Sequence, residues 1–242
     1  MTAGAPPPAS VLQGIEKLGF NVTQVYGLTE TYGHTVMSTW NSDWDTLNDE
    51  QRSALKARQG AAMVQTAGMR IVDMESQQDV PVDGKSIGEI LIRGNTVMKG
   101  YLKDAENTEA SLKNGWFHTG DLAVMHPQGY AEIKDRLKDI IISGGENISS
   151  VEIEGVLHKH EAVSLAAVVA LPDEKWGEVP CAFIELLDGA AVTEKEIEVF
   201  CRAHLAGFKR PKKVVFGELP KTATGKIQKY ELRSLARSGR LN

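Results

Sequence analysis

Residues 134–147 read KDRLKDIIISGGEN, and this stretch divides the chain. Charged residues of alternating sign give way to a short apolar run, and an apolar run bounded by a glycine turn is typical of a buried strand. Charges need partners or water, so we expect residues 134–139 at a surface or in a cleft. Because the sequence pattern differs on the two sides, we interpret this stretch as a joint between two domains, residues 1–136 and 137–242.

The part before the joint is expected to begin with a helix and a strand. Ser10 can cap a helix whose apolar positions fall on one face, namely Val11, Leu12, Ile15 and Leu18. A strand follows at residues 21–25. The chain supplies no evident partner for either element. The segment from about 40 to 60 is polar and weakly helical, which is typical of a surface excursion.

Short strands with Gly, Pro and Asp turns follow in the same part of the chain. They are expected at residues 69–74, 88–92, 121–126 and 130–134, with a hairpin turn at 127–129. Such a series predicts a small barrel or a distorted sheet that ends at the joint.

The part after the joint alternates strands and helices. Two pairs have the spacing of a capping box at a helix start, Ser149 with Glu152 and Thr193 with Glu196. The first helix is expected to carry Val151, Val156 and Leu157 inward, and the second to carry Ile197, Phe200, Cys201 and Leu205. Strands are expected at 163–171, 179–187 and 213–216, and a short helix at 230–235. The pattern predicts a small α+β domain, so the fold class of the chain is mixed α/β and α+β.

Composition narrows the class of protein. The chain has 242 residues and a formal net charge of −5, which argues against a general nucleic-acid surface. It has no run of about 18 apolar residues and no amino-terminal signal pattern, so we expect no transmembrane segment. Cys181 and Cys201 lack metal-ligand spacing and lie in apolar settings, as core thiols of a reducing cytoplasm do.

Three segments carry chemistry. YGLTE at 26–30 offers an aromatic ring, a hydroxyl and a carboxylate, which could stack on a base, bond a phosphate and hold Mg²⁺. GWFHTGD at 115–121 ends on an acid of the kind that pairs with ribose hydroxyls. KTATGK at 221–226 is a flexible loop whose lysine could deliver a charge to a phosphate or carboxylate.

Each segment also has a plain structural interpretation. The first could be a structural Tyr with a solvated Glu, the second a buried aromatic turn with a capping Asp, and the third a solvated loop. His118 is more simply structural than catalytic, because no matching Ser or Cys nucleophile motif occurs.

Six segments in one order resemble the later core motifs of the adenylate-forming superfamily of acyl-CoA synthetases, peptide-synthetase adenylation domains and luciferases. They lie at residues 3–6, 26–30, 88–94, 115–122, 134–154 and 220–226. This resemblance spans nearly the whole chain. It implies the end of a large AMP-binding domain in residues 1–136, joined to a small mobile α+β domain in residues 137–242.

The resemblance implies roles for single residues on the nucleotide side. Gly4, Ala5 and Pro6 match the loop that lines the adenine, and Tyr26 with Gly27 beside it would stack on that ring. Thr29 would bond the phosphate of the acyl-adenylate, and Glu30 would coordinate Mg²⁺. Asp121 and Arg136 would hold the ribose hydroxyls. His34 and Met37 would border the acyl pocket.

It also implies residues for the second step and for the switch between steps. Lys138 matches the hinge, and Lys226 matches the lysine that bridges the carboxylate and the α-phosphate. Gly144 and Gly145 resemble the turn along the pantetheine tunnel of CoA ligases. Phe208, Arg210 and Lys212 resemble the segment that holds the CoA nucleotide, although a basic helix exit explains them equally well. Residues 39–45 and 56–60 look most like medium-chain fatty, aryl and methylmercaptopropionate-type CoA ligases.

The resemblance has one gap, because no Ser/Thr/Gly-rich phosphate loop precedes Gly4. We therefore expect the carboxy-terminal portion of an AMP-forming acyl-CoA synthetase, with poor adenylation by the chain alone. Its expected ligands are a fatty or aryl carboxylic acid, ATP or AMP, Mg²⁺ and coenzyme A. A homo-oligomer or a complementing amino-terminal fragment is an expected partner. The alternatives are a non-catalytic nucleotide- or partner-binding fragment, and adenylation for a carrier protein.

Overall fold

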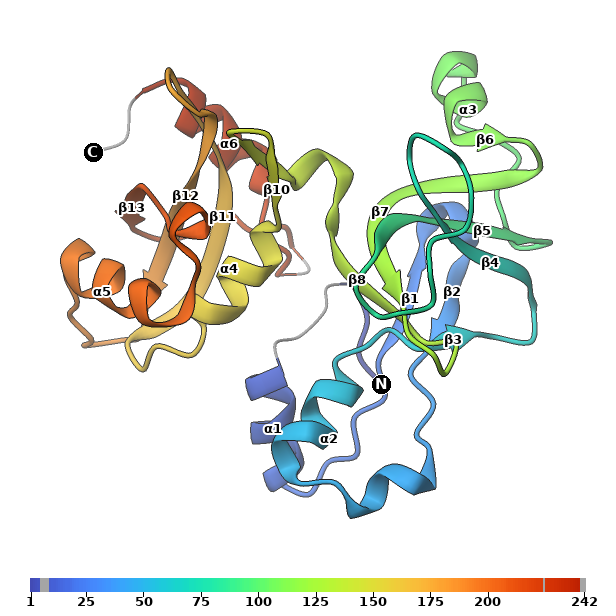
Figure 1. The fold of residues 1–242 in the computed structure, drawn as a ribbon, viewed down its shortest axis with the longest axis horizontal. Coiled ribbons are helices and arrows are strands. Elements are labelled where there is room, and N and C mark those ends of the chain that lie inside the picture. Colours follow the sequence, from blue (N-terminus) through green and yellow to red (C-terminus); the bar gives the residue numbers. More distant parts are fainter. Residues whose placement is uncertain (5–8, 224, 240–242) are drawn as a thin grey trace. The chain divides into compact units, whose positions relative to one another are not determined.

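The computed structural model describes residues 1–4, 9–223 and 225–239 (Figure 1). The chain divides into two compact units, Met1–Leu137 and Lys138–Asn242. The division falls inside the 3₁₀ turn Leu137–Asp139, within the charged stretch and one residue beyond the expected domain boundary.

The first unit contains three-stranded and five-stranded sheets with short helices. Its elements in chain order are α1 (Ala9–Lys17), β1 (Val25–Leu28), η1 (Thr29–Thr31), β2 (Gly33–Met37), η2 (Ser42–Thr46), α2 (Asp49–Lys56), β3 (Ala61–Ala62), β4 (Thr66–Val72), β5 (Ile87–Gly94), α3 (Ala105–Ser111), β6 (Leu112–Lys113), β7 (Trp116–Met125) and β8 (Ala131–Arg136).

The first helix and strand do find partners within the chain, which corrects the sequence expectation. Helix α1 packs against α2, and an ion pair joins Glu16 to Lys56. Strand β1 pairs antiparallel with β2. The apolar face of α1 is narrower than expected, because Leu12 is buried whereas Val11 and Leu18 are exposed. The strand also begins later than expected, at Val25, so Tyr26 lies inside it and not beyond its end.

The five-stranded sheet decides between the two predicted forms in favour of a distorted antiparallel sheet. Its hydrogen-bonded order is β4-β5-β7-β6, with β8 paired to β7. The β7–β8 hairpin turns at residues 127–129 as predicted, closed by the bond from the Gly129 N–H to the His126 carbonyl. Registers shift along the β4–β5, β5–β7 and β7–β8 ladders. Such shifts are bulges, which bend and twist a sheet and redirect its side chains.

The charged stretch is only partly at the surface. Leu137 and Lys138 are exposed as expected, but Asp135 is 2% exposed. Its carboxylate accepts the Arg136 N–H at 2.7 Å. The apolar run was predicted to be a buried strand, but only part of it is buried: Ile141 is buried, whereas Ile142 is 55% exposed. Strand side chains alternate between faces, so the two adjacent isoleucines of this short strand point to opposite sides of the sheet.

The second unit is a five-stranded sheet with helices on both faces. Its elements are β9 (Ile141–Ser143), β10 (Glu146–Ile148), α4 (Ser150–Leu157), β11 (Val163–Asp173), β12 (Gly177–Leu186), α5 (Glu194–His204), η4 (Gly207–Lys209), β13 (Lys213–Phe216) and α6 (Lys229–Arg237). The order is β10-β9-β12-β11, and β13 runs parallel to β12. This is the predicted α+β architecture.

Alternation along β11 explains the helices on its two faces (Figure 1). Ala166 and Val168 face the core under α4 and α5, whereas Ala167 and Val169 face the core under α6. Both predicted caps form, since the Ser149 hydroxyl accepts the Glu152 N–H and the Thr193–Glu196 box is reciprocal. Within α4 the prediction was partly wrong, because Ile153 and Leu157 are the buried apolar residues and Val151 is only partly covered.

Both cysteines are buried in the second unit and are free, Cys201 in the core under α4 and α5 and Cys181 in the core under α6. Burial raises the pKa of the Cys181 thiol to about 12 and that of the Cys201 thiol to about 11. They are inert core residues, as the sequence suggested. Among the described residues, no helix has the length and apolar character needed to cross a membrane.

Candidate functional site

The site of the first unit is built on the pairing of β7 with β8. Asp121 lies directly opposite Arg136 in this antiparallel ladder. Side chains at opposed positions sit close enough to interact, and the Arg136 Nε lies 3.2 Å from the Asp121 Oδ1. The Asp121 side chain is 6% exposed and that of Arg136 is 36% exposed. The pair therefore combines a nearly buried carboxylate with a guanidinium group that is partly exposed to solvent.

Tyr26 completes this cluster from the other sheet. Its hydroxyl donates to the Asp121 Oδ2 at 2.8 Å, across 95 residues of sequence. Burial first, and then the neighbouring Asp121 carboxylate, raise the pKa of the Tyr26 phenol well above its usual value. The phenol consequently stays a donor. A carboxylate has about four acceptor positions, so it can accept from several donors at once.

Gly27 is required by the backbone and needs no ligand to explain it. A Cβ at Gly27 would lie 1.9 Å from the Gly33 carbonyl oxygen of the paired strand. The register of β1 and β2 shifts between Tyr26 and Gly27. Glycine here lets the two backbones approach at the point where the Tyr26 side chain is set toward Asp121.

Thr29 and Glu30 lie on the short turn η1 that follows Tyr26. Sequence reasoning missed Thr31, which is 1% exposed and fixes that turn. Its hydroxyl donates to the Gly33 carbonyl at 2.7 Å and accepts the Leu28 N–H at 2.9 Å. Thr29 is exposed and Glu30 is half-buried, so the turn presents a hydroxyl and a carboxylate side by side.

A second residue missed by sequence reasoning, Tyr101, holds Glu30. The Tyr101 hydroxyl donates to the Glu30 Oε1 at 3.0 Å, and the Met98 N–H donates to the Glu30 carbonyl at 2.8 Å. Burial and the Glu30 carboxylate raise the pKa of the Tyr101 phenol. The segment 98–101 thus binds both the backbone carbonyl and the side-chain carboxylate of Glu30.

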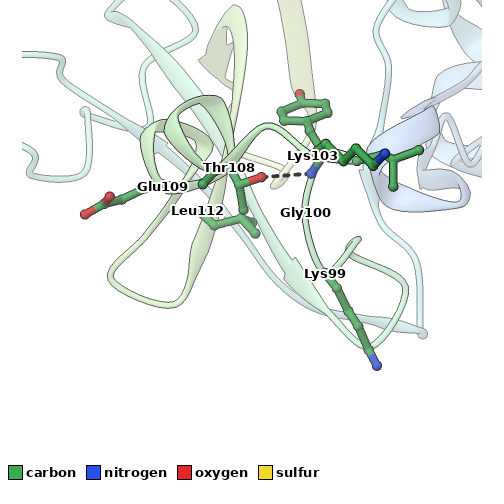
Figure 2. A pocket seen from close by; sticks show the side chains of 9 residues that line it. Lys99, Gly100, Lys103, Thr108, Glu109 and Leu112 are labelled. Carbon is green, nitrogen blue, oxygen red and sulfur yellow. Dashed lines mark hydrogen bonds between the residues drawn. The ribbon is translucent and has the colours of Figure 1, made fainter.

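The same segment lines a shallow surface pocket of roughly 560 Å³ (Figure 2). Its wall is closed by the bond from the Tyr101 N–H to the Thr108 hydroxyl at 2.9 Å. Gly100 has little freedom here, because a Cβ would meet Thr108 at 2.6 Å. Lys99 and Lys103 border the pocket with basic side chains. The bond between Tyr101 and Thr108 therefore supports the loop that holds Glu30.

Glu30 fits a cation that arrives with a nucleotide. In the described part of the chain, no group of three or more His, Cys, Asp and Glu side chains gathers as a metal site. Mg²⁺ is commonly held by only one or two carboxylates together with substrate phosphates. A single half-buried glutamate beside the Thr29 hydroxyl suits a Mg²⁺ ion that is held partly by substrate phosphates.

The other residues expected in the first unit have mixed outcomes. Thr2 pairs with Gln24 just before β1, so the segment that carries Gly4 runs beside the strand of Tyr26. Ala5 and Pro6 lie outside the described residues. His34 is exposed and Met37 is half-buried, both on β2.

In the second unit, Gly144 and Gly145 form the two-residue turn of the β9–β10 hairpin. Ser143 pairs with Glu146 across it, and both glycines have positive φ, 59° and 87°. Two-residue hairpins of this kind favour glycine. A Cβ at Gly144 would lie 2.8 Å from the ring of Trp176, whereas one at Gly145 would meet nothing within 4 Å. Trp176, which sequence reasoning missed, is 45% exposed and lies beside this turn.

Lys226 sits on a turn that is more ordered than predicted. The Thr222 N–H donates to the Lys226 carbonyl at 2.8 Å, and the Lys226 N–H donates to the Thr222 hydroxyl at 3.1 Å. The Glu185 carboxylate anchors the start of the loop through Lys221 at 2.8 Å and the Leu219 N–H at 3.0 Å. Lys226 is exposed at the end of this turn. Thr224 lies outside the described residues.

The basic segment after α5 is partly neutralised. Lys209 pairs with Glu152 at 2.7 Å, and the Arg210 Nε donates to the Leu205 carbonyl at 3.1 Å. Phe208 and Lys212 are exposed. The segment keeps both of its interpretations, since an exposed aromatic ring and a cation suit a nucleotide as well as a basic helix exit.

Comparison with known proteins identifies the family. Residues 1–102 match the family described as AMP-binding enzyme, and residues 152–226 match the AMP-binding enzyme C-terminal domain. Acetate–CoA ligase CCL3 of Humulus lupulus is 52% identical over 242 residues, 98% of this chain and 43% of the relative. Trans-cinnamate:CoA ligase of Petunia hybrida is 49% identical over 239 residues, 98% of this chain and 42% of the relative.

Solved structures agree. ATP-bound MatB from Rhodopseudomonas palustris has a TM-score of 0.84 at 31% identity, covering 96% of this chain and 44% of that one. The o-succinylbenzoate CoA synthetase MenE of Bacillus subtilis, in complex with its acyl-adenylate, has a TM-score of 0.78 at 33% identity, covering 96% and 45%. The chain spans less than half the length of the relatives it matches. It belongs to the family of AMP-binding, adenylate-forming enzymes.

Proposed function

We propose that the protein carrying this chain is an AMP-forming acyl-CoA ligase. A carboxylate oxygen of the acid attacks the α-phosphorus of ATP, and pyrophosphate leaves. The CoA sulfur then attacks the carbonyl carbon of the acyl-adenylate, and the bond from that carbon to the phosphate oxygen breaks to release AMP. The observation that carries the proposal is Asp121, held between the Tyr26 hydroxyl and the Arg136 guanidinium beside the turn of Thr29 and Glu30.

Each residue of the first unit has a role that follows from its position. Asp121 and Arg136 accept and donate to the ribose hydroxyls, and the Tyr26 ring packs on the adenine with Gly27 and the Gly4–Pro6 loop. Thr29 donates to the phosphate. Glu30 holds Mg²⁺, which offsets the charge that grows on the phosphoryl oxygens.

The second unit supplies the remaining charges. Lys226 bridges the acid and the α-phosphate during adenylation, where a positioned cation lowers the barrier to bringing two anions together. For the thioester step, Gly144 and Gly145 admit the CoA thiol, and Trp176 with Phe208, Arg210 and Lys212 contacts the CoA nucleotide. Lys138 takes up the backbone rotation between the two steps.

The names of the relatives suggest the acid. They include ligases of acetate, butyrate, 2-methylpropanoate and cinnamate. We propose a short aliphatic or aryl acid as substrate, ATP and CoA as co-substrates, and a reducing compartment as the setting of the free cysteines. We expected the cytoplasm, and three of the relatives are named as peroxisomal. A segment that supplies a phosphate-binding loop would complete the site.

The test uses the full-length protein in which this sequence occurs. It is incubated with ATP, Mg²⁺, CoA and acetate, butyrate or cinnamate, and acyl-CoA, AMP and pyrophosphate are measured by mass spectrometry. We expect stoichiometric acyl-CoA and AMP, and their loss in Lys226→Ala by about 10²-fold or more. Nucleotide binding without any acyl-CoA would reduce the function to binding. Acyl transfer to added carrier protein in place of CoA would replace the proposal with carrier adenylation.

A further inference from the structure

Glu89 in β5 is a buried acid that none of the roles above uses. It is 8% exposed, and its two carboxylate oxygens have different partners. The Oε2 lies 2.8 Å from the His118 Nδ1, and the Oε1 accepts the Gly120 N–H at 2.9 Å. Both partners lie in β7, immediately before Asp121. A buried carboxylate is costly without such partners, so its place here calls for a reason.

The reason lies in the register of β5 and β7. Glu89 pairs with Leu122 and Leu91 pairs with His118, so residues 119–121 together face Ile90 alone. The strand bulges at this point, and ordinary ladder hydrogen bonds are lost. Gly120 takes a φ of +69°, a conformation that suits glycine.

Side chains replace the missing ladder bonds of the bulge. The Thr119 hydroxyl donates to the Ile90 carbonyl at 2.7 Å and accepts the Asp121 N–H at 3.1 Å. The Glu89 carboxylate takes the Gly120 N–H. The N–H groups of Gly120 and Asp121 are therefore both held by side chains at the point where these residues leave the β5–β7 ladder.

We propose that Glu89 is a positioning residue of the nucleotide site. Its carboxylate holds Gly120, and so sets the direction in which the Asp121 carboxylate reaches Tyr26 and Arg136. His118 contacts the second oxygen of Glu89, so it orients the Glu89 carboxylate and affects Asp121 only through Glu89. The inference rests on the proposed function, because it needs Asp121 as a ribose ligand. A ligand displaced by about 1 Å can cost as much as 10²-fold in function.

The same sheet provides a matched control. Glu132 on β8 pairs with His126, the residue that follows β7, with an Oε2 to Nε2 distance of 2.8 Å. This glutamate–histidine pair resembles that of Glu89, but its histidine is five residues along the chain from Asp121. Removing either acid removes a part-buried glutamate–histidine contact. Glu132 also pairs with Lys134, and only Glu89 touches the bulge.

The experiment compares wild type, Glu89→Gln, Glu89→Ala and Glu132→Ala of this chain at a temperature where circular dichroism shows each to be folded. Two quantities are measured: the AMP dissociation constant by calorimetry and the exchange rate of the Gly120 amide by NMR. Glu89→Ala should raise the AMP dissociation constant by about tenfold or more and should increase the exchange rate of the Gly120 amide. Glu89→Gln keeps an oxygen acceptor for the Gly120 N–H and should restore most of both. Glu132→Ala should change neither.

Two results would overturn the proposal: unchanged Gly120 exchange in Glu89→Ala, or an AMP affinity within twofold of wild type in the same folded variant. Absence of AMP binding by the wild-type chain would instead count against the ribose role of Asp121. In that case Gly120 exchange still decides whether Glu89 holds the bulge.

Discussion

Tyr26→Phe removes one hydroxyl and leaves the ring. The lost bond is the 2.8 Å contact with the Asp121 carboxylate, whose side chain is 6% exposed. Hydrogen bonds to charged groups contribute about 1.5–3 kcal/mol, and Arg136 remains to keep the carboxylate paired. We expect the free energy of unfolding of the first unit to fall by that amount, since the phenol is protonated and donating throughout the neutral range.

Tyr130→Phe is the matched control for this change. The Tyr130 hydroxyl donates to the neutral Thr39 carbonyl at 2.6 Å, away from the cluster. A bond between neutral groups contributes about 0.5–1.5 kcal/mol, so its loss should cost less. Both variants are unfolded in urea and titrated with AMP. Tyr26→Phe should be less stable and should bind AMP more weakly, because Asp121 is less well held. Tyr130→Phe should bind AMP with the wild-type affinity. Equal effects of the two variants on stability and on AMP would refute the cluster as described.

Three further predictions concern the second unit and the boundary between units. The Lys221 ammonium and then the Leu219 N–H lower the pKa of Glu185, so its stabilisation is present above the unfolded value of about 4.3 and is lost as pH falls. Glu185→Gln should therefore lower the melting temperature at pH 7 and not at pH 3, and a pH-independent loss would contradict this. Cys181 and Cys201, with raised thiol pKa values, should resist iodoacetamide in the native protein and react in urea, as mass spectrometry can show; rapid native labelling would speak against their burial. Lys138→Pro fixes φ at the expected hinge, and in the full-length enzyme it should spare acyl-adenylate formation while slowing thioester formation. Equal loss of both half-reactions would remove the hinge role.

The sequence predicted the hairpin that carries part of the candidate site. The resemblance pointed to Asp121 and Arg136, and the turn at 127–129 joins the two strands on which they lie opposite each other. The α+β form of the second unit was likewise readable, because alternating residues of β11 must be covered on both faces.

What the sequence did not predict depends on bulges and loops. Glu89 looks like an ordinary strand residue until the register shift of β7 turns the Gly120 N–H toward it. Tyr101 reaches Glu30 across 71 residues from a loop whose path no periodicity predicts. Trp176 lies against Gly144 because a hairpin turn and a β-strand end meet. Such contacts join segments distant in sequence, where local pattern carries little information.

The most direct test of the ribose site compares AMP with 2′,3′-dideoxy-AMP in calorimetric titrations of this chain. We expect AMP to bind, and we expect the removal of both ribose hydroxyls to weaken binding by about tenfold or more, since each bonds a charged group at Asp121 or Arg136. The difference between the two nucleotides should disappear in Asp121→Ala. Equal affinity of wild type for AMP and its dideoxy form would contradict the assignment of Asp121 and Arg136 to the ribose.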